Sequence, residues 1–171
     1  DFINKINKGN KTCLIVSPVV LVKYKNNYKN LFGYLKSTLV LDGIYNEALG
    51  AEILASKYLE QLQDETRVPL LTQRCPAATE YIKIYQPTLI NNLAHLHSPA
   101  VVLANYIRRK LKFDGDIAYL GPCIAKRREF KDPDTDGSGQ YNLTFDSLEK
   151  YLQLHKVDIN KYQEESFDLE S

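Results

Sequence analysis

The sequence of 171 residues contains no methionine and begins with Asp1, so we expect it to be a piece of a longer protein. It has three cysteines, too few for the disulfide framework of a secreted domain. We therefore expect a reducing, cytoplasmic setting. It also lacks an apolar run long enough to cross a bilayer, and we expect no membrane partner.

The formal net charge is only +1, so the composition predicts no general attraction to nucleic acid. The few glycines form no phosphate-binding fingerprint. A phosphatase-type anion loop is excluded, because Ile124 and Ala125 rather than glycines follow Cys123. A zinc site has little support, since the sequence contains no C-x-x-C and no clustered Cys/His pair.

Short apolar runs alternate with amphipathic segments, which predicts an α/β fold with a mostly parallel sheet flanked by helices. The expected strands cover residues 12–17, 38–41, 68–73, 116–120 and 141–144. The expected helices cover residues 1–11, 24–36, 46–63, 77–85, 87–93, 98–112 and 146–155. A loop at 131–140, rich in Asp, Gly, Pro and Ser, predicts a first lobe at 1–130 and the start of a second lobe at 131–171.

Two cysteines follow apolar runs at the ends of expected strands. Cys75 precedes Pro76, and Cys123 follows Pro122, so each marks a point where the chain leaves a strand. Strand ends that precede helices share one edge of a parallel sheet, and that edge is where such sheets bind ligands. We therefore expect both cysteines to face one crevice. Cys13, inside the first strand, is interpreted as a small buried hydrophobe.

Two chemistries use thiols at such an edge. A catalytic thiol needs a base, and His95 or His97 could approach, although no local signature supports that pairing. An iron–sulfur cluster takes four thiolates, of which these two would be half. Arg74 and the basic run 126–128 would favour thiolates and an anionic cluster, although composition alone favours a solvated basic turn.

Several motifs then resemble one family in the order in which they occur. Residues 72–76 (T-Q-R-C-P), 98–99 (S-P) and 122–129 (P-C-I-A-K-R-R-E) are similar to motifs of the iron-only (di-iron) hydrogenase large subunit, C-terminal domain. That family carries T-S-C-C-P and M-P-C-x-x-K-x-x-E. Residues 16–18, 50–52, 141–144 and 167–168 resemble further segments, so the resemblance covers nearly the whole chain.

The resemblance implies roles for individual residues. Cys75 and Cys123 would bind the cubane part of the active-site cluster. Lys126 would contact a ligand of the di-iron unit, and Ser98 would belong to the proton path. The third motif, which supplies the last two cysteines, is not in this sequence. In this chain alone we expect no ordered cluster, because metal binding and formation of the site are coupled.

Other positions depart from the family pattern. Arg74 replaces the proton-delivering cysteine, and Gly121 replaces the methionine that packs on the di-iron unit. The glutamates that continue the proton path fall on Tyr58 and Gln61. Arginine keeps its charge and cannot relay a proton at neutral pH. Efficient hydrogen turnover is therefore not expected.

The sequence thus favours an iron–sulfur hydrogenase-like domain with a redox-sensing or hydrogen-sensing role. A divergent hydrogenase catalytic subunit is the first alternative, and a metal-free α/β interaction module is the second. The expected cofactor of the full-length protein is a cubane iron–sulfur cluster, and the sequence leaves open whether a di-iron unit joins it. The expected partner is a redox protein, or a fused ferredoxin-type or sensor domain.

Overall fold

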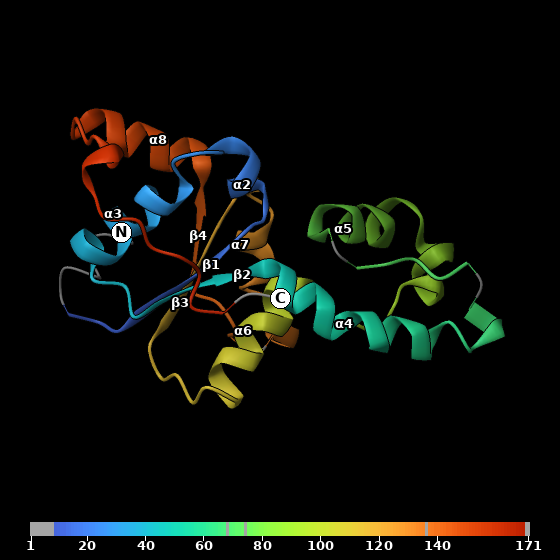
Figure 1. Ribbon diagram of the computed structural model, residues 1–171. Coiled ribbons are helices and arrows are strands. Elements are labelled where there is room, and N and C mark those ends of the chain that lie inside the picture. Colours follow the sequence, from blue (N-terminus) through green and yellow to red (C-terminus); the bar gives the residue numbers. More distant parts are fainter. Residues whose placement is uncertain (1–8, 68, 74, 136, 170–171) are drawn as a thin grey trace.

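The computed structural model describes residues 9–67, 69–73, 75–135 and 137–169, and these ranges form an α/β fold around one parallel sheet (Figure 1). The strands within them are β1 (Thr12–Val16), β2 (Gly43–Asn46), β3 (Asp116–Gly121) and β4 (Tyr141–Thr144). They pair in the order β2-β1-β3-β4, and every pairing is parallel. The expected fold class is therefore confirmed. The division into lobes at residue 130 stays a prediction.

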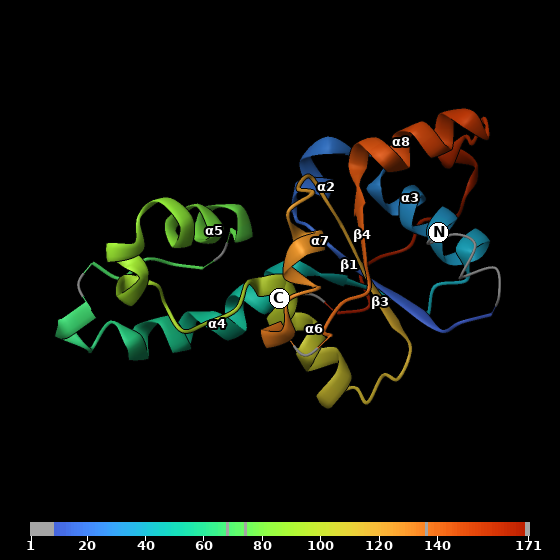
Figure 2. The same ribbon diagram turned by 180° about the vertical axis from the view of Figure 1, so that it is seen from behind.

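Helices cover both faces of the sheet (Figures 1 and 2). Helices α3 (Tyr28–Leu39) and α8 (Phe145–Leu154) pack on one face, and α6 (Pro99–Arg109) packs on the other. Successive residues of β1 alternate between the two layers, because side chains along a strand point to opposite faces. Burial on both sides explains why the strands are continuous apolar runs rather than alternating ones.

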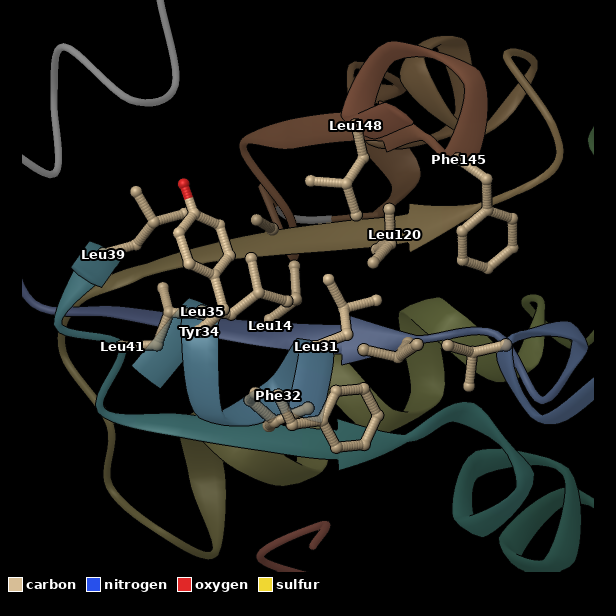
Figure 3. Close-up of a cluster of buried hydrophobic side chains, with 14 of the residues drawn as sticks. Leu14, Leu31, Phe32, Tyr34, Leu35, Leu39, Leu41, Leu120, Phe145 and Leu148 are labelled. Atoms are coloured by element: carbon tan, nitrogen blue, oxygen red, sulfur yellow. The ribbon is translucent and has the colours of Figure 1, made fainter. Parts of the chain in front are cut away.

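The larger core lies between the sheet, α3 and α8 (Figure 3). Its labelled side chains are Leu14, Leu31, Phe32, Tyr34, Leu35, Leu39, Leu41, Leu120, Phe145 and Leu148. The C-terminal segment completes this core, since the rings of Phe32 and Phe167 lie 4.8 Å apart and edge to face. Asp168 accepts a hydrogen bond of 2.7 Å from the backbone N–H of Ile44. The segment that contains Phe167 and Asp168 is thus attached to α3 and β2.

Cys13 belongs to the smaller core beneath α6, where it is fully buried. Desolvation raises the pKa of its thiol to about 12, and the nearby Arg108 opposes this only in part. A thiol that stays protonated inside a strand packs as a small apolar group. The structure agrees with the interpretation of Cys13 as a buried core residue.

The expected second strand at 38–41 is wrong. Helix α3 continues to Leu39, and Val40 then adopts a left-handed backbone conformation with φ of 49°. The strand is β2, a few residues later, because Leu39 and Leu41 are buried at a turn instead of in the sheet. Asp42 fixes that turn by accepting a hydrogen bond of 2.6 Å from the N–H of Thr12.

The expected third strand at 68–73 is also wrong, as far as its described residues show. Leu71 makes only an isolated bridge with Leu93, away from the sheet, and Val68 lies outside the described residues. The expected helix at 1–11 falls mainly on residues 1–8, which also lie outside them. No helix of the described ranges is long and apolar enough to span a membrane.

The described residues between 47 and 97 form an arm that projects from the carboxyl end of the sheet (Figures 1 and 2). The arm contains α4 (Glu47–Gln61), η1 (Glu65–Arg67), α5 (Pro76–Tyr85) and η2 (Pro87–Asn92). At the base of the arm, α4 packs closely on α6. This close approach requires glycine at position 50, because a Cβ there would collide with the carbonyl oxygen of Pro99. Asn46 caps α4 by accepting a 2.9 Å hydrogen bond from the N–H of Ala48.

The remaining described helices are short and connect the larger elements. They are α2 (Val19–Lys23), α7 (Lys126–Glu129), η3 (Pro133–Thr135) and η4 (Ile159–Lys161). Helix α2 follows β1 and α7 follows β3, so both lie beside the carboxyl edge of the sheet. The chain segments that can build a site therefore meet at that edge.

Candidate functional site

A pocket of about 280 Å³ lies at the carboxyl ends of β1, β2 and β3. It is lined by Pro18, Glu47, Ala48, Ala51, Cys75, Pro76, Pro99, Tyr119, Cys123 and Lys126. The strand order reverses between β1 and β3, and ligands of open α/β sheets bind outside such a switch point. The pocket thus occupies the position at which this topology builds a site, and both expected edge cysteines line it.

Cys123 reaches the pocket from the end of β3, as the sequence predicts. Asn142 of β4 donates hydrogen bonds to the carbonyl oxygens of Cys123 (2.9 Å) and Ile124 (3.1 Å). The N–H of Ala125 points back to the Cys123 sulfur, with 3.4 Å between nitrogen and Sγ. This loop therefore holds the thiol in a defined orientation.

Cys75 reaches the same pocket by another route. It is the residue before α5, and Pro76 begins that helix. The segment before Cys75 is attached to the rest of the arm by Gln73, whose side-chain amide donates a 2.5 Å hydrogen bond to the carbonyl oxygen of Ala94. The two cysteines therefore line one pocket, as predicted, but the arm delivers Cys75, not a strand of the sheet. Cys75 is exposed, and Cys123 is partly exposed.

An ion pair joins the arm to helix α7. Arg128 of α7 contacts Glu80 of α5, with 2.7 Å between Nη2 and Oε2. Glu80 is partly buried while Arg128 is largely exposed, so the pair is weakly shielded from solvent. It nevertheless joins the two helices that follow the two cysteines.

Lys126 is buried at the pocket wall, with only 4% of its surface exposed. Its Nζ donates to Ser98 Oγ at 2.6 Å and to Glu129 Oε2 at 2.9 Å. A buried ammonium needs such partners, because an unpaired charge in the interior is costly. Ser98 precedes α6 but its side chain makes no capping hydrogen bond. Its hydroxyl contacts Lys126 instead.

The sequence reasoning missed Glu47 and Tyr119. The Tyr119 hydroxyl donates a 2.9 Å hydrogen bond to Glu47 Oε2, and both residues line the pocket. Burial raises the pKa of the Tyr119 phenol well above its usual value, and the charge of Glu47 raises it further. One signal was available: period-2 alternation puts Tyr119 on the same face of β3 as Gly121.

Gly121, Gln61 and Tyr58, which the sequence also singled out, are not among the residues that line this pocket. Gly121 is buried at the end of β3. Gln61, at the far end of α4, accepts a 3.1 Å hydrogen bond from the backbone N–H of His95. Tyr58 lies on the same helix and is partly buried. Arg74 lies outside the described residues.

No histidine is among the described residues that line this pocket. His97 lines a separate, smaller pocket of about 90 Å³ between α5 and α7. A Cys–His catalytic pair therefore gains no support here. Within the described ranges, no group of three or more His, Cys, Asp or Glu side chains is placed to hold a metal ion. The pocket offers two thiols from distant segments, which fit half of a four-thiolate cluster site.

Comparisons with known proteins give the family and the fold of this chain. The family model described as iron only hydrogenase large subunit, C-terminal domain, matches residues 10–171. A variant of the [FeFe]-hydrogenase HydA1 from Chlamydomonas reinhardtii is 20% identical, with a TM-score of 0.80 over 98% of this chain and 50% of its own. HydA(deltaEFG), from work on stepwise H-cluster assembly, is 19% identical, with a TM-score of 0.80 over 98% and 49%.

A third solved [FeFe]-hydrogenase, from work on damage to the 2Fe subcluster of the H cluster by oxygen, is 18% identical. Its TM-score is 0.79, with coverage of 98% of this chain and 49% of its own. At these identities the likeness is one of fold. The chain spans about half the length of the solved structures that it matches.

Proposed function

Because this chain belongs to the iron-only hydrogenase large subunit, C-terminal domain family, we propose that its pocket is one half of an iron–sulfur cluster site. We propose further that the full-length protein uses the cluster for redox or hydrogen sensing rather than for efficient hydrogen turnover. The observation that carries the proposal is that Cys75 and Cys123, from separate segments, line one pocket at the switch point of the sheet.

The residues present suit a cubane cluster. Cys75 and Cys123 would supply two thiolate ligands, and residues outside this sequence would supply the other two. The N–H that Ala125 directs at the Cys123 sulfur is of the kind that tunes the potential of a cluster. When bound, the cluster supplies one-electron transfer. Two of the solved relatives are described by their H cluster and its 2Fe subcluster. We therefore include a further di-iron unit in this proposal.

Lys126 would place a fixed positive charge at the wall of the site. Its two hydrogen bonds, to Ser98 and Glu129, leave the ammonium little freedom to move. The Glu129 carboxylate offsets this charge, so the pair would act on an anionic group in the pocket as an oriented dipole that needs no reorganisation. The Ser98 hydroxyl accepts from Lys126, so we assign it first to holding this charge.

The regulatory part of the proposal rests on groups that would have to carry protons. Arg74 stands where the family motif has a cysteine, and a guanidinium does not release its proton at neutral pH. Gln61 uses its amide oxygen to hold the backbone of His95, and an amide does not relay protons as a carboxylate does. A sensing protein would exchange electrons with a redox partner, or with a fused ferredoxin-type or sensor domain.

The ligand assignment is tested on full-length protein reconstituted anaerobically with iron and sulfide. The unsubstituted protein should show the absorption and EPR signals of a cubane cluster, and Cys75→Ser or Cys123→Ser should lower its iron content. Cys13→Ala is the matched control, because that thiol is buried away from the pocket. Unchanged iron content in both pocket variants would show that the ligands are wrongly assigned.

A further inference from the structure

Tyr119 and Gly121 are coupled through space at the end of β3. A Cβ added at Gly121 would lie 2.5 Å from Cε1 of the Tyr119 ring and 2.7 Å from its hydroxyl oxygen. Real Cβ atoms do not approach other atoms this closely. The tyrosine ring therefore occupies the space that any side chain at position 121 would need. The glycine is what allows the ring to lie over the end of the strand.

Two further contacts fix the ring. Its edge packs against Phe130, with centroids 6.2 Å apart, and its hydroxyl is held by Glu47 at 2.9 Å. The Lys126 ammonium lies 5.8 Å from the ring centroid, close enough for a cation–π attraction. The buried hydroxyl has its hydrogen-bond acceptor in Glu47, and moving the ring would leave that hydroxyl unsatisfied.

We infer that Tyr119 is the side chain through which β3 contacts the group held between Cys75 and Cys123, with Glu47 as the residue that positions its hydroxyl. The inference rests on the proposed function, because it takes the cluster as the occupant of the pocket. Both cysteines, Tyr119 and Glu47 line the same pocket as Lys126 does. Tyr119 approaches from the sheet, whereas Cys75 approaches from the arm. The chain thus presents the Tyr119 side chain at this wall.

The steric part of the inference is tested without any cofactor. Gly121→Ala should lower the urea midpoint of the chain, whereas the same change in a Tyr119→Ala background should have a clearly smaller effect. The difference between the two effects measures the coupling directly. Equal effects in both backgrounds would show that the ring does not occupy the space over Gly121, and would overturn the inference.

The cofactor part is tested on the reconstituted full-length protein through the EPR spectrum and midpoint potential of its cluster. Tyr119→Phe should shift both. Tyr45→Phe is the control, because Tyr45 lies over Gly43 of β2 in the same manner but outside the pocket. Glu47→Ala should reproduce the shift of Tyr119→Phe, and Glu47→Gln should restore most of the original values because its amide oxygen still accepts the hydrogen bond.

The outcomes distinguish a failure of the proposed function from a failure of the inference about Tyr119. If the unsubstituted protein forms no cluster, the proposed function fails. If a cluster forms but Tyr119→Phe changes its spectrum no more than Tyr45→Phe does, the inference fails while the proposed function stands. A shift in Glu47→Ala that Glu47→Gln does not restore would overturn the positioning role of Glu47.

Discussion

The hydrogen bonds of Lys126 allow a quantitative prediction. Its side chain is 5% exposed and that of Glu129 is 11% exposed, so the pair is shielded from solvent. Glu129→Ala would leave a buried ammonium with one neutral partner, and breaking a buried pair in this way costs about 3–5 kcal/mol. Ser98→Ala removes one hydrogen bond to a charged group, which costs about 1.5–3 kcal/mol.

The double variant Lys126→Met/Glu129→Ala should recover most of the loss, because it removes the uncompensated charge together with its partner. The measurement is urea unfolding of each variant, compared at constant m-value so that midpoints report stability. Lys57 and Glu60 form a matched surface pair at the same spacing, with both side chains more than half exposed. Glu60→Ala should cost well under about 1 kcal/mol. A Glu129→Ala loss as small as that control would show that water solvates Lys126, and the argument for a fixed charge would fail.

Three further predictions concern the core, the arm and the proton route. Between pH 9 and 12 the unfolded chain loses the Cys13 proton while the folded chain keeps it. The free energy of unfolding should therefore fall by about 1.4 kcal/mol per pH unit. Cys13→Val should remove that part of its pH dependence. Gly50→Ala should cost roughly 1–3 kcal/mol in thermal or urea unfolding, because the new methyl meets the Pro99 carbonyl; an unchanged midpoint would mean that α4 and α6 can separate freely. In matured full-length protein, Arg74→Cys should raise hydrogen uptake with an artificial electron acceptor, and ordinary hydrogenase rates with Arg74 in place would favour a catalytic subunit instead.

The sequence predicted the site best where local rules and tertiary structure agree. At Cys123, an apolar run ends at a proline beside the cysteine, and the structure has β3 and its exit loop there. Around residues 68–73 the same signals occur, but the only bridge made by the described residues of this range joins Leu71 to Leu93 within the arm. Short apolar runs do not reveal which partner they will pair with. The meeting of the two cysteines was predictable, but the route of Cys75 was not.

The Tyr119–Glu47 pair lay beyond sequence reasoning for a different reason. The two residues are 72 positions apart, and they meet only because β2 and β3 flank β1 in the sheet. Neither residue belongs to a motif. A tyrosine two residues before a glycine in a mostly aliphatic strand was the one available sign. It became informative only when the structure placed the glycine beneath the ring.

The geometry of the site depends on the arm at least as much as on the sheet. Cys123, Tyr119 and the start of α4 are fixed by strands, whereas Cys75 is carried by α5 and reaches the pocket from outside the sheet. The contacts that α4 and α5 make with α6 and α7, Gly50 with Pro99 and Glu80 with Arg128, therefore set how Cys75 is placed against Cys123. A change at the partly exposed Glu80–Arg128 pair would cost little folding stability, since such ion pairs contribute little. It could still move one thiol relative to the other, so cluster binding is a more sensitive readout of this contact than unfolding is.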